Sequence, residues 1–319
     1  MPVGITSEAN RIVGKSTGQS IVKTAHPGSD FSSLIKRGKM RLRFFLFRRF
    51  HQQVKDLFAD HRLQQITLTH PRIYEKIYRE YITNGATISE RLQILTAHYR
   101  FVNSVFSDEL IRSVYVSQDF RLCTISLPND NGTIIARLAY RQRFEKEGEL
   151  TLSLLDDNGK RLYSVSFSID ACDGKPSALI GCLIGPSFTD DSVNSETIKS
   201  LTKSMHGMRP KNLLFFVLQV LCREMGIRSI HAIAAQAHVY GGSSKKLERI
   251  KFNYDEFWEE VGGQRLDTKL ISLPLHHEKR PYEEIKTNKR AAYTRRYALL
   301  ENIEMDIADT LQTEIIRSN

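Results

Sequence analysis

The sequence predicts an α+β fold, in which helices flank a mixed but mainly antiparallel sheet and further helical segments stand at both ends of the chain. Three observations lead to this prediction. Between about residues 113 and 185, apolar residues recur with the two-residue period of strands. A nearly all-apolar helical pattern follows at 210–225, and a β-like run comes directly after it. Helical patterns precede the strand region and close the chain.

Composition sets the broad class of the protein. Of 319 residues, 41% are hydrophobic and 26% are charged, which is typical of a globular rather than a disordered chain. The four cysteines form no C-x-x-C pair, and Cys182 and Cys222 stand in apolar runs, so we expect buried thiols. The N-terminus lacks an apolar signal segment, and no run approaches the ~20 apolar residues of a membrane span. We therefore expect a cytoplasmic location.

Positive charge is concentrated near the N-terminus. Residues 1–60 carry 11 Lys and Arg against 4 Asp and Glu, a net charge of +7 out of +10 for the whole chain. Within residues 31–58, phenylalanines alternate with basic residues. This helical segment either lies on the anionic inner face of the cytoplasmic membrane, as a peripheral anchor, or packs its rings on the main domain and leaves its arginines in water. Nucleic-acid binding is the weaker reading, because no recognition-module pattern accompanies the mixture.

Two helices with clear end signals are expected next. The first should begin at Pro71, which suits a first helical position, and end at Asn84-Gly85. The second should open with a capping box formed by Thr87 and Glu90. Its apolar face is expected to comprise Leu92, Leu95, Tyr99, Val102 and Phe106.

Sequential hairpins are predicted in the strand region. Asn131-Gly132 and Asn158-Gly159 are each flanked by β-type runs, which is the strongest short-range hairpin signal. The expected strands are residues 121–127, 133–143, 149–156, 161–169 and 177–185. Consecutive hairpins make these strands antiparallel. An exposed loop with a short helix is expected over 186–205.

A strand, helix, strand unit is expected to follow. Pro210 suits the first turn of the helix, and the strand at 230–235 should lie parallel to the preceding one, because a crossover helix joins them. The free amides of the helix start, with Arg209 and Lys211, favour an anion such as phosphate, unless these two are ordinary surface charges. Beyond this unit we expect a helix at 254–261, a strand at 265–275 and helix from 282 to 316.

Four separated segments carry a family resemblance. MHGMRPKNLLFFVLQVLCREMGI, SIHAIAAQAH, KFNYDEFWEEVGG and KTNKRAAYTRRYALL occur in an order that resembles the VirK/YbjX family of bacterial proteins, also described as DUF535. The resemblance covers roughly residues 70–319. It implies an association with virulence, the cell envelope and resistance to antimicrobial peptides, and it brings no established reaction.

The order of elements is also similar to that of GNAT-type acyltransferases. That similarity implies that acyl-CoA, or another phosphate-bearing ligand, binds at the start of the 210–225 helix. The candidate ligand-binding residues are Gly207, Arg209, Lys211 and Asn212. The segment has one glycine where those enzymes have a Gln/Arg-x-x-Gly-x-Gly/Ala phosphate loop.

Direct acyl transfer needs a base that deprotonates an amine and an acid that protonates the leaving thiolate. Candidate bases are His206, His238, Asp255 and Glu259, and Tyr254 is the candidate acid. A histidine after a β-run can equally be a core or rim residue, and the acidic residues can equally be the solvated face of a short helix. No metal site is expected, because the adjacent His276 and His277 point apart and no ligand spacing is present.

The chain is therefore expected to divide into a loose leader (1–30), a basic and helical N-terminal region (31–110) and an α/β domain with a C-terminal helix (111–319). Two functions remain open. One is acyl transfer to a component of the cell envelope. The other is a non-enzymatic factor that assists expression or surface localisation of virulence and outer-membrane proteins, through a protein partner, and supports antimicrobial-peptide resistance.

Overall fold

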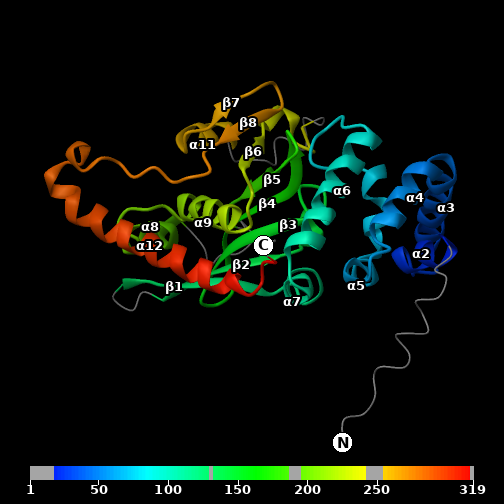
Figure 1. The fold of residues 1–319 in the computed structure, drawn as a ribbon, viewed down its shortest axis with the longest axis horizontal. Coiled ribbons are helices and arrows are strands. Elements are labelled where there is room, and N and C mark those ends of the chain that lie inside the picture. Colours follow the sequence, from blue (N-terminus) through cyan, green and yellow to red (C-terminus); the bar gives the residue numbers. More distant parts are fainter. Residues whose placement is uncertain (1–17, 129–131, 187–194, 242–253, 317–319) are drawn as a thin grey trace, which may run out of the picture.

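An eight-stranded mixed sheet with strand order β1-β2-β3-β4-β5-β6-β8-β7 lies at the centre of the molecule (Figure 1). The computed structural model describes residues 18–128, 132–186, 195–241 and 254–316. The sheet and the helices around it confirm the predicted α+β class.

The first five strands form the predicted antiparallel meander: β1 (Phe120–Ser126), β2 (Thr133–Ala139), β3 (Leu150–Asp156), β4 (Arg161–Cys172) and β5 (Lys175–Ile184). Gly132 and Gly159 take positive φ values of 87° and 75°, as the predicted hairpin turns require. Strand β2 ends at Ala139, four residues before the expected end, where Tyr140 turns into the core and its amide bonds to Val114.

Helices cover the sheet on both sides. Helix α6 (Ile88–Val105) packs on β4, whereas α9 (Pro210–Glu224) packs on β3 and β4, and α12 (Arg290–Gln312) packs on β1 (Figure 1). Every residue of β3 from Leu150 to Leu155 is buried, and the two buried hydroxyls, of Thr151 and Ser153, are paired at 2.8 Å with Ser166 and Ser164 of β4. Helix α9 is buried nearly all round, as its composition predicts.

The capping box is present. The Glu90 amide donates to Thr87 Oγ1 at 3.2 Å, and the Thr87 amide donates to Glu90 Oε2 at 2.6 Å, so two otherwise unpaired donors at the start of α6 are satisfied. The helix expected between Pro71 and Asn84 begins at Pro71 as predicted, but it is a 3-10 helix and ends at Tyr78. After this helix, η1 (Pro71–Tyr78), the chain turns at Ile82, whose φ is 61° and whose amide bonds to the Lys146 carbonyl.

A buried ion pair fixes η1 against the sheet. Lys76 and Glu149 form a salt bridge with 3% and 0% of their side chains exposed. Tyr99 donates a 2.6 Å hydrogen bond to the other Glu149 oxygen, and the Lys76 ammonium lies over the rings of Tyr81 and Tyr140. The fully buried charges are thus compensated by each other and by aromatic rings.

The basic N-terminal segment differs from expectation. Residues 31–58 form two helices, α3 (Phe31–Leu46) and α4 (Arg48–Leu57), because the backbone leaves the helical region at Phe47. The break lets Phe44 and His51 stack at 3.5 Å inside the core. Part of the expected loose leader also forms helix α2 (Gly18–Ala25), which buries Val22. Residues 1–17 of that leader lie outside the described residues.

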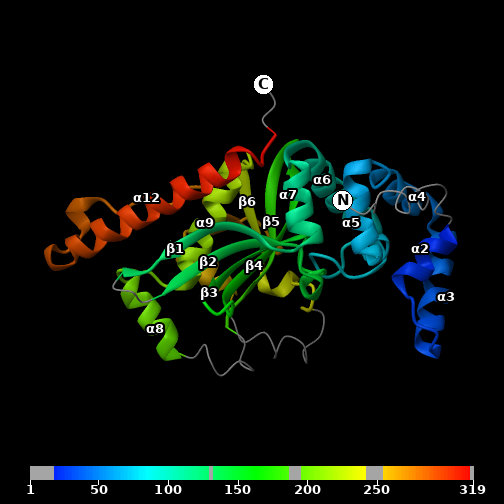
Figure 2. The same cartoon turned by 90° about the horizontal axis from the view of Figure 1, so that it is seen from below.

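The N-terminal helices α2, α3 and α4 stand together at one end of the longest axis, away from the sheet (Figures 1 and 2). Helix α5 (His61–Thr69), the short α7 (Asp108–Ile111) and the π-helical turn η2 (Arg112–Val116) connect them to the domain. Within the part of the chain that is described, no helix combines the length and apolar character needed to cross a bilayer.

The second half of the sheet contains the predicted parallel pair. Helix α8 (Ser195–Ser204) precedes α9, and β6 (Ser229–Ile233) then runs parallel to β5. The single strand expected at 265–275 is wrong. A hairpin of β7 (Gln264–Arg265) and β8 (Leu270–Leu273) occupies it, because the Asp267 carboxylate accepts the amides of Lys269 and Leu270 and turns the chain.

The chain ends in helix, as expected, but less continuously. The short turns η6 (Tyr282–Glu284) and η7 (Thr287–Lys289) precede α12, so the long helix begins eight residues later than predicted, at Arg290. The predicted helix at 254–261 is present as α11 (Tyr254–Glu260).

Candidate functional site

Strands β5 and β6 part at their carboxyl ends. Their parallel pairing runs from Ser177 with Ser229 to Ile180 with Ala232, whereas β5 continues to Ile184 along β4. Helices α8 and α9 lie between the two strands in the chain, and α9 leads directly into β6. Ligands of α/β proteins bind preferentially outside the carboxyl ends of strands at such a change of direction in the sheet. This opening is the candidate site.

A bulge in β5 marks the start of the opening. Ser166 of β4 pairs with Cys182 and Phe167 pairs with Ile180, so Gly181 is the extra residue. A Cβ atom on Gly181 would lie 2.0 Å from the backbone oxygen of Glu147. Only glycine permits this approach, which brings the segment before β3 across β5.

Glu147 is therefore held at the opening. Its side chain is buried, one carboxylate oxygen has no hydrogen-bond partner within the described ranges, and burial raises its pKa to about 7. Burial, together with the nearby Glu147 and Cys182, raises the pKa of Tyr240 to about 12. A carboxyl group with a pKa near neutrality can accept and release a proton at physiological pH.

His238 follows β6, and its ring lies 5.6 Å from the ring of Tyr240. Residues Thr83 and Asn84 hold its backbone. Thr83 forms an isolated antiparallel β-bridge with His238, and the Asn84 amide donates a hydrogen bond to the Ala237 carbonyl at 3.0 Å. Burial lowers the pKa of His238 to about 4, so its ring is neutral at pH 7. The Tyr240 amide donates to Nδ1 at 3.3 Å, which places the ring proton on Nε2.

That Nε2 atom is buried and has no partner among the described residues. A neutral ring with its proton on Nε2 is a hydrogen-bond donor there, so His238 suits an electron-rich ligand atom better than the role of base. Tyr254, the first residue of α11, stacks on the His238 ring at 5.7 Å with an interplanar angle of 13°. Burial raises the Tyr254 pKa far above its usual value, which keeps the phenol protonated.

The structure thus brings two of the predicted catalytic residues, His238 and Tyr254, together. Both carboxylate oxygens of Asp255 already have partners. One accepts a hydrogen bond from the Ala235 amide at 2.9 Å, and the other forms an ion pair with Arg265 at 2.5 Å. Glu259 is exposed. His206 lies in the turn between α8 and α9 with φ of 53°, and its carbonyl accepts hydrogen bonds from Arg296. Burial and then Arg295 and Arg296 lower the pKa of His206.

The predicted anion position at the start of α9 is filled by a carboxylate of the chain itself. Glu260, from the end of α11, pairs with Arg209 at 3.0 Å and Lys211 at 2.8 Å, and Asn212 Nδ2 approaches it at 3.5 Å. Burial opposes ionisation, but the hydrogen bond and charge of Lys211 hold the pKa of Glu260 below its usual value. Gly207 has φ of 83° and serves the preceding turn, beside Arg296.

Sequence reasoning missed Glu147, Cys182 and Tyr240 as site residues. Glu147 stands in an acidic and basic stretch without a motif, and only tertiary packing brings it to Gly181. An isolated glycine inside a strand pattern is the one available signal, since it indicates a close backbone approach. Burial holds the pKa of Cys182 well above its usual value, so its thiol is not an activated nucleophile.

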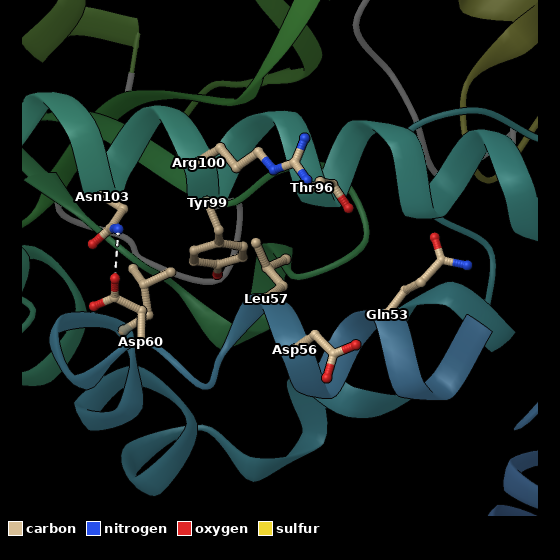
Figure 3. Close-up of a pocket in the computed structure, with 9 residues that line it drawn as sticks. Gln53, Asp56, Leu57, Asp60, Thr96, Tyr99, Arg100 and Asn103 are labelled. Carbon is tan, nitrogen blue, oxygen red and sulfur yellow. Dashed lines mark hydrogen bonds between the residues drawn. The ribbon is translucent and has the colours of Figure 1, made fainter. Parts of the chain in front are cut away.

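A cavity of about 420 Å³ lies between α4 and α6 (Figure 3). Arg100 and Thr96 face it from α6, and Asp56 and Gln53 face it from α4. The remaining lining residues are Leu57, Asp60, Leu63, Tyr99 and Asn103. Asp60 and Asn103 are joined at 2.9 Å, and Asp60 also caps α5, so these polar groups hold the helices together.

Within the described ranges, no cluster of three or more His, Cys, Asp or Glu residues could hold a metal ion. Of the adjacent histidines, His277 packs edge-on against the Phe216 ring at 5.6 Å.

Comparison with known proteins agrees with the resemblance inferred from the sequence. A family model described as "Protein of unknown function (DUF535)" matches residues 30–309, and so begins before residue 70, where the resemblance was expected to start. The chain is 27% identical over 241 residues to the uncharacterized protein YbjX of Escherichia coli K12, covering 75% of this chain and 72% of that protein. It is 28% identical over 219 residues to an uncharacterized protein of Haemophilus influenzae Rd, covering 69% and 70%.

Proposed function

The chain belongs to the DUF535 family, and from the geometry of its sheet opening we propose that it is an acyl-transfer enzyme of the GNAT type. The observation that carries the proposal is one opening, between two parallel strands joined by α8 and α9, where two buried polar groups lack partners. These are one carboxylate oxygen of Glu147, Oε2, and the ring nitrogen Nε2 of His238, both unpaired within the described ranges. Buried polar atoms are rarely left unsatisfied, so such a pair favours a ligand between them.

The order of elements supports the same proposal. An antiparallel meander leads into β5, then helices α8 and α9, the parallel strand β6, the short helix α11 and a final hairpin. This order is the one that resembles GNAT-type enzymes. Fold resemblance alone does not assign chemistry, and the proposal therefore depends on the side chains at the opening.

The three side chains supply complementary chemistry for transfer of an acyl group from a thioester to an amine. Glu147 takes the proton from the attacking ammonium group, since its pKa of about 7 suits a base near neutral pH. The amine nitrogen then attacks the thioester carbonyl, and a C–N bond forms. The Nε2 hydrogen of His238 stabilises the negative charge that develops on the carbonyl oxygen.

Collapse of the intermediate breaks the C–S bond and releases the thiolate, while the nitrogen loses its remaining extra proton to solvent and becomes the amide nitrogen. The Tyr254 phenol, kept protonated by its raised pKa, donates its proton to that sulfur and regains one from solvent. The products are an amide and a free thiol. An envelope component is proposed as the acceptor only because the family resemblance is to envelope-associated proteins.

The start of α9 is proposed to receive the phosphates of the acyl-CoA. Arg209 and Lys211 lie there, but both are paired with Glu260. Ligand phosphates would therefore have to replace the Glu260 carboxylate as the partner of these two cations. Breaking the existing ion pairs would lower the affinity for acyl-CoA. Helix starts of this kind favour anions through their amides and dipole.

A second candidate function has specific support. The Glu260 carboxylate already satisfies Arg209 and Lys211, and one glycine stands where acyl-CoA enzymes have a glycine-rich loop. Both features suit a protein whose cofactor cleft has lost its ligand. Such a protein would be a non-enzymatic factor that assists the expression or surface localisation of envelope proteins.

Calorimetric titration with acetyl-CoA and a longer acyl-CoA separates the two candidates. We expect binding to the wild type and about tenfold weaker binding for Arg209→Ala and Lys211→Ala, about 1.4 kcal/mol. Lys203→Ala, an exposed cation on α8, is the matched control and should bind normally. No binding to the wild type would reject the transferase and leave the non-enzymatic candidate.

Turnover is tested by the release of free thiol from acyl-CoA in the presence of amine acceptors. Glu147→Gln and Tyr254→Phe should abolish release while leaving acyl-CoA affinity within about twofold, because neither is placed at the phosphates. If both variants retain full activity, the roles assigned to these residues are wrong.

A further inference from the structure

Helix α3 presents an apolar stripe to solvent. The Phe31 and Phe45 side chains are 77% and 74% exposed, although aromatic side chains of this size are normally largely buried. The other exposed apolar residues of the helix are Leu34, Ile35, Leu42 and Leu46. Isolated exposed apolar residues are common, whereas a contiguous set marks a surface that binds something.

These six residues share one side of the helix. At 3.6 residues per turn they fall within about 120° of one another. Met40 and Phe44, the buried residues of α3, project from the opposite side and pack in the core. The helix therefore has two apolar faces, one used by the fold and one left without a partner in the described structure.

Positive charge borders the exposed stripe. Lys39 and Arg41 lie on opposite flanks of the stripe. At 3.6 residues per turn, each projects about 80° around the helix axis from the centre of the stripe. Both are exposed, and neither forms an ion pair with any residue that the structure describes. No acidic residue occurs from Phe31 to Phe50, so nothing along this segment offsets the charge.

We propose that α3 docks on an anionic lipid surface, with its exposed apolar stripe among the acyl chains and Lys39 and Arg41 at the headgroups. The pattern of an apolar face flanked by cations is that of helices which lie in the plane of a bilayer interface. Basic residues next to the apolar face are attracted by the negative surface potential of such a membrane. The proposed lipid-binding surface consists of α3 alone and not of the whole expected segment 31–58, because the helix is interrupted at Phe47 before α4 begins.

The position of α3 in the molecule permits this contact. Helices α2 to α4 stand at one end of the long axis, and the sheet lies beyond them toward the other end (Figures 1 and 2). A bilayer can thus meet α3 without meeting the opening between β5 and β6. The proposal does not rest on acyl transfer and holds equally for a non-enzymatic protein.

Aliphatic side chains favour lipid over nucleic acid as the occupant. Single-stranded nucleic acids stack their bases on aromatic or guanidinium planes. Four of the six exposed residues are leucine or isoleucine, which offer no such plane but insert readily among acyl chains.

The test is co-sedimentation of the full chain with vesicles of phosphatidylglycerol and phosphatidylethanolamine, compared with phosphatidylcholine vesicles. We expect binding to the anionic vesicles only, and a loss of at least fivefold when salt is raised from 0.1 M to 0.5 M, since screening shortens the reach of the charges. The triple variant Phe31→Ser/Leu42→Ser/Phe45→Ser should bind at least tenfold more weakly. All three side chains are exposed, so folding should be unaffected.

Two matched controls complete the experiment. Leu68→Ser/Met305→Ser removes exposed apolar side chains elsewhere and should bind like the wild type. Lys39→Glu/Arg41→Glu should lose binding, whereas Lys175→Glu/Arg228→Glu, which changes the charge equally at another exposed site, should lose at most twofold.

Three outcomes would overturn the proposal. One is wild-type binding to neither vesicle. Another is unchanged vesicle binding by the serine triple variant. The third is that the wild type binds single-stranded RNA, or self-associates in sedimentation velocity, and that the triple variant loses this property but still binds vesicles. That result would assign α3 to nucleic acid or to a second copy of the chain.

Discussion

Lys211 and Glu260 form an ion pair, with 2.8 Å between Nζ and Oε2, that joins the start of α9 to the end of α11. Arg209 shares the same carboxylate at 3.0 Å. A ligand phosphate at this helix start must compete with Glu260. We expect Glu260→Gln to tighten the binding of acyl-CoA by about tenfold, about 1.4 kcal/mol, because both cations become available. Calorimetry at low ionic strength measures this directly.

The matched control for that substitution is Glu196→Gln, which removes a carboxylate paired with Lys199 on α8. It should leave affinity unchanged. If Glu260→Gln weakens binding instead, the carboxylate positions Arg209 and Lys211 for the ligand rather than competing with it.

Lys76→Met should be among the most destabilising single substitutions in the chain. It leaves the Glu149 carboxylate, which is fully buried, without its cation, and breaking a buried pair in this way costs about 3–5 kcal/mol. Urea unfolding followed by circular dichroism measures the loss in free energy of unfolding. Lys199→Met, which breaks the exposed pair with Glu196, should cost at most about 0.5 kcal/mol.

The double variant Lys76→Met/Glu149→Leu shows whether the two charges stabilise the fold through their interaction or whether each side chain contributes only through its own packing. The double variant leaves no buried charge without a partner. Its loss in free energy of unfolding should therefore be well below the sum of the losses in the two single variants. Additive costs would mean that the two side chains contribute independently.

Local signals in the sequence predicted local structure well. The capping box of Thr87 and Glu90, the turn at Gly159 and the positive φ of Gly132 depend on a few adjacent residues, and all are present within the described ranges. The hairpin at Asp267 has a local signal, the turn-forming Asp, but the apolar strand pattern that follows extends the predicted strand through it.

The site could be predicted only in part, for a physical reason. His238 and Tyr254 follow a strand and begin a helix, so their positions could be inferred from the order of elements. Glu147 reaches the site through a backbone approach at Gly181, which no sequence spacing encodes. The sequence also predicted cations at the start of α9 correctly, but not that Glu260 would pair with them.

Glu147→Gln should stabilise the protein in a pH-dependent manner. The folded pKa of Glu147, about 7, lies above its ordinary value of 4.5, so the folded state binds the proton more tightly than the unfolded state. The contribution of Glu147 to stability is therefore fully present below pH 4.5 and is lost as pH rises through about 7. The variant should gain up to about 3 kcal/mol over wild type at pH 8 and almost nothing at pH 4.5.

Urea unfolding of both proteins at the two pH values provides this comparison. Glu109→Gln, at an exposed carboxylate, should change stability little at either pH. An equal effect of Glu147→Gln at both pH values would mean that the Glu147 carboxyl titrates alike in the folded and unfolded states, and its role as a base near neutrality would then be withdrawn.

Gly181→Ala tests the close approach that builds the site. The added Cβ would lie 2.0 Å from the Glu147 oxygen and 2.8 Å from its carbonyl carbon, so the backbone before β3 or the bulge in β5 must move. We expect a loss of about 3 kcal/mol in the free energy of unfolding, at the upper end of overpacking costs. Gly38→Ala is the matched control: its Cβ meets nothing within 4 Å on α3, so it should gain about 0.5–1 kcal/mol from helix propensity. Because the displaced backbone carries Glu147, Gly181→Ala should also lower thiol release from acyl-CoA at least tenfold, even at temperatures where it remains folded. A folded Gly181→Ala variant with normal activity would show that the position of Glu147 over β5 does not matter for the reaction.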